Sequence, residues 1–342
     1  MKKSLLALAV LGAYAGLATA QSSVTLFGIV DLNARYVKND GQSRRISLSQ
    51  DGINSSRLGF RGIEDLGGGL RAGFWLEAGI NPDTGVAGSA TGGKFFNRRS
   101  TVSLINQMGE LRLGRDYTPT FWNQTIFDAF GTNGLGSSTN VAQIGTSVGV
   151  RQDNSIGYFL PSNIGGFYGQ AMVGAGESGT TLDRPGRHIS GRIGFAAGPF
   201  DIAASIGHQR YATTNERQKT YNVGGSYDFG FLKLLGYYQR DDYDLADAKE
   251  TRMSISTLFK MGQGEIHLGY DRDKLDVAGG DSTVDQIKAT YQYNLSKRTA
   301  MYGTVSRLAN KDLTSSALGG GFTPITPGGD SKGFEVGLRH IF

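Results

Sequence analysis

Apolar and polar residues alternate along this chain from near its beginning to its last residue. The windows 24–33, 57–62, 70–78, 287–293 and 334–342 each place mostly apolar or small residues at every second position and mostly charged or polar residues between them. A period of two residues is typical of β-strands whose two faces meet different surroundings, and a helical period of 3.6 residues fits none of these windows. The chain is therefore predicted to be all-β.

Two kinds of connection separate the predicted strands. Seven are short turns, most of them glycine-rich, at 65–70, 106–110, 161–166, 196–200, 228–231, 260–265 and 294–298. Eight are longer and polar, at about 38–52, 81–94, 118–151, 176–187, 211–217, 242–249, 274–282 and 309–332. Fifteen connections imply sixteen strands, to within one hairpin. An even number of strands with short turns alternating with long loops is typical of an antiparallel transmembrane β-barrel.

The last residue, Phe342, also fits a barrel. The first and last strands of a barrel pair with each other, so that no strand edge remains unpaired in the hydrocarbon. A terminal aromatic residue then lies in the aromatic belt at the periplasmic rim. Two alternatives remain: a soluble secreted β-sandwich that buries the apolar face as its core, and a barrel specialised as an enzyme or adhesin.

The amino terminus predicts export. Lys2 and Lys3 precede an apolar run, 5–17, and small residues follow at 18–20, which together predict a signal peptide over residues 1–20. The alternative is a transmembrane anchor, for which the apolar run is short. Residues 21–342 would then form the barrel. They contain no cysteine, and without the leader they carry 33 Lys and Arg against 30 Asp and Glu, a balance that does not indicate nucleic-acid binding.

Five segments, in order along the chain, resemble the general-diffusion porins of beta-proteobacterial outer membranes, including their anion-selective members. They are SSVTLFGIVDLN, SSRLGFRGIEDLGGGLRAGFWLE, FNRRSTVSL, GELRLGRDYTPTF and DNSIGYFLP, and the resemblance runs from Ser22 to Phe342. It implies a homotrimer of sixteen-stranded barrels in contact with outer-membrane lipid and lipopolysaccharide, each with a third loop folded inward. It also implies a passive channel for small anions and hydrophilic solutes. No catalytic residue, cofactor, metal or nucleic-acid partner is expected.

The third loop is assigned to residues 118–151. Four aromatic residues are expected to hold it against the barrel wall, and Asp128 is expected to offer a negative charge toward the lumen. The aromatic residues are Phe121, Trp122, Phe127 and Phe130. The alternative is an external loop that projects into solvent.

Several charged residues are predicted to face the lumen. Arg57 and Arg61 share the polar face of the second strand, and Arg71 and Glu77 share that of the third. An arginine on the lipid face near the membrane midplane costs about 2–4 kcal/mol, so the lumen is the favoured assignment.

Three further arginines complete the predicted constriction. Strand alternation places the Arg99 side chain inside the barrel, whereas the resemblance favours its neighbour Arg98 as the pore residue. A β-bulge or a loop at this point would reconcile the two assignments. The resemblance also implies a lumen-facing base at Arg151, where the inward loop returns to the wall. A wall of arginines facing few carboxylates concentrates anions and repels cations. The alternative for each arginine is a structural ion pair.

Overall fold

Antiparallel strands make up most of this protein, as seen in a computed structural model that describes residues 23–87, 93–144, 149–176, 186–211, 216–244, 247–312, 314–319 and 326–342. The predicted signal peptide, residues 1–20, lies outside the described residues. The strands are β1 Ser23–Asn39, β2 Arg45–Gln50, β3 Arg57–Gly67, β4 Leu70–Asn81, β5 Val86–Ala87, β6 Arg99–Asn106, β7 Gly109–Tyr117, β8 Arg151–Phe159, β9 Phe167–Gly174, β10 His188–Ala197, β11 Phe200–Arg210, β12 Arg217–Asp228, β13 Leu232–Tyr243, β14 Ala248–Met261, β15 Gly264–Val277, β16 Gly280–Asn294, β17 Thr299–Asn310 and β18 Asp330–Ile341.

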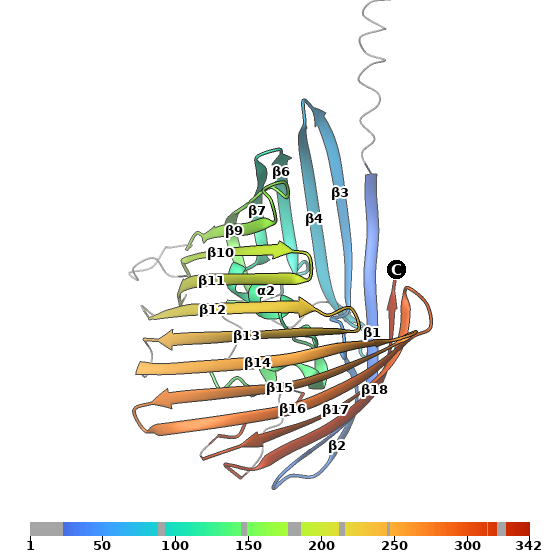
Figure 1. Cartoon of the computed structure of the whole chain (residues 1–342), viewed down its shortest axis with the longest axis vertical. Helices are drawn as coiled ribbons and strands as arrows, with labels where there is room; N and C mark the ends of the chain where they lie inside the picture. Colours follow the sequence, from blue (N-terminus) through green and yellow to red (C-terminus); the bar gives the residue numbers. More distant parts are fainter. Residues whose placement is uncertain are drawn as a thin grey trace, which may run out of the picture.

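The sheet closes on itself because its first and last strands pair. β1 and β18 run antiparallel from Ile29 opposite Ile341 to Asn39 opposite Ser331. Beyond that ladder, Gly28 and Phe342 exchange two backbone hydrogen bonds of 3.1 Å. The carboxyl end of the chain therefore lies beside β1 (Figure 1). The predicted antiparallel barrel is confirmed, and Phe342 lies at its seam.

Sixteen strands form the wall, although eighteen are separate segments among the described residues. β2 and β3 pair with different halves of β1 and together make the second strand of the barrel, with a break between Gln50 and Arg57. β5 only extends a short hairpin from the end of β4. The number of strands in the wall is the number predicted.

Two predicted loops differ in their bounds. The loop expected at 38–52 is mostly strand, because β1 continues to Asn39 and β2 begins at Arg45. In the break that follows β2, the Asp31 carboxylate accepts the backbone N–H groups of Ile53 at 3.0 Å and Asn54 at 2.8 Å. A buried carboxylate thus satisfies backbone groups that have left the ladder.

The prediction of a long loop at 274–282 is also wrong, since only two residues separate β15 from β16. The charged residues there resemble those of a loop. They lie instead on paired strands, with Lys274 Nζ 2.7 Å from Asp276 and 2.8 Å from Asp281. Each of the seven predicted short turns does join two adjacent strands.

The two faces of the wall differ in the way that the alternation predicts. On β6, Val102 and Leu104 are exposed by 53% and 49%, whereas Thr101 and Ser103 are buried against interior side chains. An apolar surface of this kind recurs on the outward face of the other strands. The apolar face is thus outside and the polar face inside, the reverse of a β-sandwich core.

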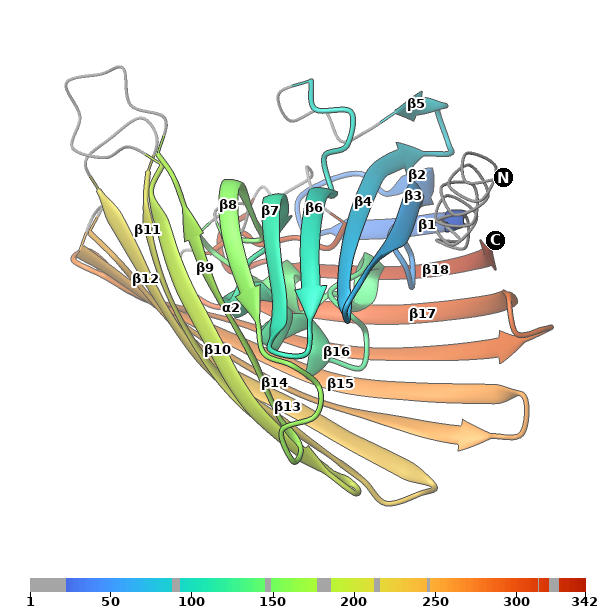
Figure 2. The same cartoon turned by 90° about the horizontal axis from the view of Figure 1, so that it is seen from above.

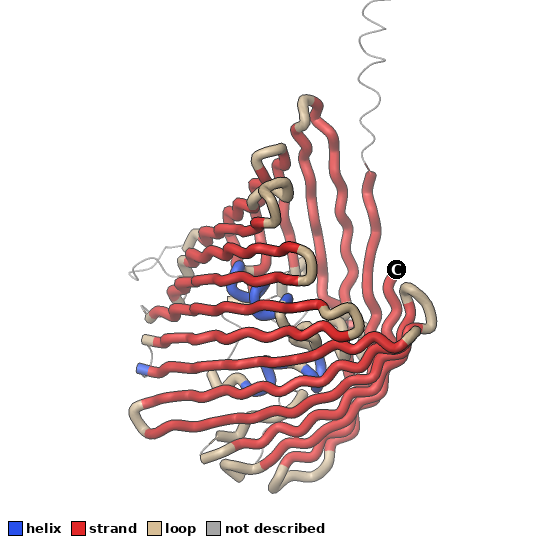
Figure 3. The backbone as a smooth tube through the Cα atoms, in the orientation of Figure 1, coloured by secondary structure: helices blue, strands red, loops and turns tan. Residues whose placement is uncertain are grey.

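A segment with three short helices lies within the ring of strands, between β7 and β8 (Figures 2 and 3). They are the α-helix α2, Pro119–Ile126, and the 3-10 helices η1, Gly134–Gly136, and η2, Ser138–Val141. Thr118 caps α2, since its Oγ1 accepts the backbone N–H of Phe121 at 3.3 Å. No helix among the described residues is long and apolar enough to cross a membrane.

Candidate functional site

Inward-facing glycines leave space for the segment that contains α2. A Cβ atom added at Gly224 of β12 would lie 2.3 Å from Cδ2 of Phe127, and one at Gly207 of β11 would lie 3.0 Å from Cγ2 of Thr120. Between these contacts, the side-chain amide of Asn123 donates to the Ala203 carbonyl oxygen at 2.9 Å. Glycine at these wall positions therefore lets the segment pack directly on the sheet.

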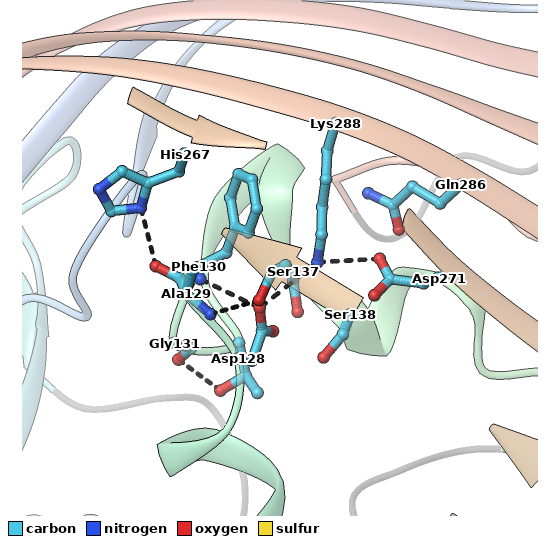
Figure 4. Close-up of polar contacts among 12 residues, drawn as sticks. Asp128, Ala129, Phe130, Gly131, Ser137, Ser138, His267, Asp271, Gln286 and Lys288 are labelled. Carbon is cyan, nitrogen blue, oxygen red and sulfur yellow. Dashed lines mark hydrogen bonds and ion pairs between the residues drawn. The ribbon is translucent and has the colours of Figure 1, made fainter. Parts of the chain in front are cut away.

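A buried lysine ties the same segment to the opposite strands (Figure 4). Lys288 Nζ on β16 lies 2.8 Å from the Asp271 carboxylate of β15 and 3.6 Å from that of Asp128, and all three side chains are fully buried. The ammonium group also lies 4.4 Å from the ring centroid of Phe130. Asp128 borders the interior cavity, and it shares this one lysine with Asp271.

Two further carboxylates bind the backbone of the segment. Glu250 of β14 accepts the N–H groups of Gln143 at 2.7 Å and Ile144 at 3.2 Å. Glu335 of β18 accepts the N–H of Leu135 at 3.3 Å. The Leu135 side chain is fully buried in an apolar cluster with Val37, Val141, Val284, Leu308 and Leu318.

The aromatic residues of the segment divide into two pairs. Phe127 and Phe130 are buried, as an anchoring role requires, although Phe130 also borders the interior cavity. Phe121 and Trp122 line the interior cavity, and the Phe121 ring stacks on Tyr117 with centroids 5.4 Å apart.

The interior cavity has a volume of about 1200 Å³ and lies between this segment and the wall. Among the described residues, its lining carries five cationic side chains against two carboxylates. The cations are Arg57, Arg98, Arg151, Lys297 and Arg339, and the carboxylates are Asp128 and Glu265. The cavity therefore carries an excess of fixed positive charge.

Arg57, Arg98 and Arg151 gather around one carboxylate and one phenol. Glu77 Oε1 lies 2.6 Å from Arg98 Nε and 3.4 Å from Arg57 Nη1. The Tyr117 hydroxyl accepts hydrogen bonds of 2.6 Å from both Arg98 Nη2 and Arg151 Nη2. We call these five residues the arginine cluster. Three guanidinium groups face one carboxylate at ion-pair distance, and the Asp51 carboxylate interacts with Arg57 and Arg98 from farther away.

The ends of three strands and the interior of a fourth bring the arginine cluster together. Arg57 and Arg151 are the first residues of β3 and β8, Glu77 lies on β4, and Tyr117 is the last residue of β7. Arg98 precedes β6, with its backbone N–H 3.1 Å from the Glu77 carbonyl oxygen. The direction of the Arg98 side chain is therefore not set by the inward and outward alternation of a strand.

The other predicted residues lie elsewhere. Arg61 and Arg99 line a second cavity, of about 410 Å³, beside Trp75. Arg71 is exposed near the turn at the start of β4 and lines neither cavity.

Sequence reasoning missed three of the residues that shape the interior cavity. The alternation of the last strand, which turns Phe334, Val336 and Leu338 outward, would have placed Arg339 inside. No such signal marks Tyr117, whose role depends on two arginines that are distant in sequence. Lys297 lies in a short turn, where alternation does not apply.

Comparisons with known proteins agree with this architecture. A family model described as Gram-negative porin matches residues 7–313. The chain is 41% identical over 360 residues to outer membrane porin protein 32 of Delftia acidovorans. It is 30% identical over 411 residues to an outer membrane porin protein of Bordetella pertussis. Both alignments cover the whole of each chain.

Solved structures show the same relationship. An anion-selective porin from Comamonas acidovorans superposes with a TM-score of 0.82 at 37% identity, over 94% of this chain and 100% of that one. OmpT, an outer membrane protein of Vibrio cholerae, shares the fold with a TM-score of 0.70 at 14% identity, over 94% of this chain and 98% of that one. From the extent of these matches, the chain belongs to the Gram-negative porin family and is a channel protein of the outer membrane, not an enzyme.

Proposed function

We propose that the channel admits small hydrophilic solutes by passive diffusion and prefers anions, and that the arginine cluster makes the selection. The observation that carries this proposal is the meeting of three guanidinium groups, only one carboxylate among the described residues being ion-paired with them, at the edge of the interior cavity. Guanidinium groups stay charged at any relevant pH. Fixed positive charge at a narrow, low-dielectric point raises the local concentration of anions and excludes cations.

The segment from 118 to 151 acts as the constriction loop in this proposal. Its described part contacts β9–β13 through α2 and β15–β18 through η1 and η2, so it fills part of the lumen between two regions of the wall. Phe127, Lys288 and Glu250 would keep it there. The loop narrows the path opposite the arginine cluster, where the fixed charge then acts at short range.

The zero-current potential under a tenfold KCl gradient tests the selectivity. The refolded protein in a planar bilayer should show the sign expected for chloride. Arg57→Ala, Arg98→Ala and Arg151→Ala should each move the potential toward zero, because each removes a cation from the cluster. Arg240→Ala is the matched control, since Arg240 is an exposed residue of β13 paired with Asp242, away from both cavities. A potential of the sign for potassium, or equal shifts in the control, would overturn the proposal.

We further propose a homotrimer whose contact surface is the low part of the wall. The neighbouring strands β6–β9 have only eight or nine residues, whereas β14–β16 have fourteen or fifteen. A strand needs about 9–11 residues to span the hydrocarbon. The short strands of the low wall are shielded from the membrane when they lie against other subunits. The taller wall then faces outer-membrane lipid and lipopolysaccharide. The family resemblance supports the number three.

Chemical cross-linking in detergent tests this assembly. Bands up to three times the monomer mass should form, and a pure monomer would contradict the proposal. We also propose that residues 1–20 are a signal peptide removed on export. The intact mass of protein isolated from outer membranes should then correspond to a chain that starts at Gln21.

A further inference from the structure

The second cavity lies nearer the short turns than the arginine cluster does. Arg61 follows Arg57 by four residues along β3, toward the turn that ends this strand. At about 3.3 Å per residue, the two arginines are separated by roughly 13 Å along the strand. The volume of about 410 Å³ suits a small molecule. Along β3, the second cavity therefore lies between the arginine cluster and the short-turn end of the barrel.

The three arginines of this cavity differ in how far their own neighbours satisfy them. Arg112 forms hydrogen bonds with both carboxylate oxygens of Glu110, at 2.8 and 2.9 Å, and with Asp116 at 2.5 Å. Arg99 donates to Thr101 at 3.0 Å and lies 3.8 Å from Asp116. These two guanidinium groups are largely engaged with protein partners.

Arg61 is different. No hydrogen bond or ion pair joins it to any residue in the described part of the chain. Its guanidinium carbon lies 5.2 Å from the ring centroid of Trp75 and 5.5 Å from that of Phe27, so aromatic rings hold it in place. Its N–H groups remain available to a carboxylate from outside the protein.

The remainder of the lining is mixed: Ser23, Thr25, Ser103 and the Arg112-bound Glu110 are polar, and an apolar group lies beside them. Trp75 lines the cavity together with Ile63 and Ile105, and Ile63 is 48% exposed. The Trp75 ring is fixed, since its Nε1–H donates to Glu77 at 3.0 Å and its face contacts Phe27 at a centroid distance of 4.9 Å. The Arg99 guanidinium carbon also lies 4.6 Å from the Trp75 ring centroid, so Ile63, Ile105 and the part of the indole that these groups leave uncovered form the apolar surface beside Arg61.

We propose that this cavity is a transit binding site for aromatic monocarboxylates. The carboxylate of the solute accepts hydrogen bonds from the N–H groups of the Arg61 guanidinium group, and its ring packs against Trp75, Ile63 and Ile105. An inorganic anion gains only the charge contact, and a neutral aromatic solute gains only the apolar one. The site rests on the proposed function, because it selects among the anions that the channel admits.

Tryptophan fluorescence measures this binding without any ion flow. The chain has two tryptophans, so Trp122→Phe leaves Trp75 as the only reporter. Benzoate should change its fluorescence saturably in detergent, whereas acetate, sulfate and benzyl alcohol should do so only at concentrations at least tenfold higher. Arg61→Gln in the same background should raise the half-saturating benzoate concentration about tenfold, as expected when a charge-assisted hydrogen bond is lost. Arg240→Gln is the control and should leave it unchanged.

The zero-current potential of the same proteins distinguishes a failure of the aromatic site from a failure of the anion selectivity. If the wild type conducts chloride with the anion sign but benzoate binds no better than acetate or sulfate, the aromatic site is wrong and the anion channel stands. The site is also wrong if Arg61→Gln binds benzoate as the parent does. If benzoate binds as expected while the zero-current potential has the potassium sign, the site stands and the anion selectivity fails.

Discussion

Replacing Lys288 by methionine should release part of the constriction loop. The side chains of Lys288, Asp271 and Asp128 are fully buried, so methionine would leave two carboxylates facing each other away from water. Removing one partner from a buried ion pair costs about 3–5 kcal/mol. Burial of the Phe130 ring beside them contributes about 1.5–3 kcal/mol. The electrostatic cost exceeds this contribution, and the chain around Asp128 should move until water reaches the carboxylates.

The movement should be local. Glu250 still holds the backbone at Gln143, and Glu335 still holds Leu135, so the rest of the segment stays on the wall. The ladders of β15 and β16 do not depend on the Lys288 ammonium group. We therefore expect Lys288→Met to form a barrel of normal heat stability whose lumen is less tightly filled.

Single-channel recordings measure the effect. Lys288→Met should show higher open-channel noise and a changed unit conductance relative to the wild type. Combining it with Asp128→Asn and Asp271→Asn should restore quiet channels, because a neutral cluster carries no uncompensated charge. If Lys288→Met is as quiet as the wild type, or if the neutral triple variant is as noisy as the single one, the ion pair does not hold the loop.

Three other outcomes follow from the structure. Tyr117→Phe removes the hydrogen-bond acceptor shared by Arg98 and Arg151 but none of their charge, so the zero-current potential should move toward zero by less than in Arg98→Ala; an equal shift would contradict this. Gly28→Val places a Cβ atom 2.2 Å from the Phe342 ring, and overpacking of this kind costs about 1–3 kcal/mol. The variant should therefore give a lower yield of refolded, heat-modifiable barrel on gels. An unchanged yield would refute the close fit at the seam. Raising the ionic strength from 0.1 to 1 M shortens the Debye length from about 10 to about 3 Å, so the anion-to-cation permeability ratio should fall, and a constant ratio would argue against selection by fixed charge.

The barrel could be predicted from the sequence because its main signal is local. The outward position of Val102 and the inward position of Thr101 depend on strand alternation alone, and the same rule holds around the wall. Where local polarity is a poor guide, the prediction failed. The charged residues from Lys274 to Asp281 resemble a loop, but the ladder between β15 and β16 pairs them as extended strands, and the ion pair between Lys274 and Asp281 joins the two strands.

The contacts inside the barrel could be predicted only in part. Alternation placed Arg57 and Glu77 on the inner face, and they do meet there. Lys288 lies on the polar face of the window 287–293, but its partners Asp271 and Asp128 come from a neighbouring strand and from the distant inner segment. Pairings of this kind depend on the closed three-dimensional structure and leave no pattern in neighbouring residues.

The pairing of β1 with β18 has a consequence for the order of assembly. Ile29 and Ile341 face each other across the seam, so the two ends of the chain must meet before the last ladder can form. Contacts between residues so far apart in sequence are slow to form. Until they do, both terminal strands present unpaired N–H and C=O groups that can bind strands of other chains. The period before the ends meet is therefore when this chain is most prone to aggregate, and a factor that shields β1 until Phe342 arrives would increase the yield of closed barrels.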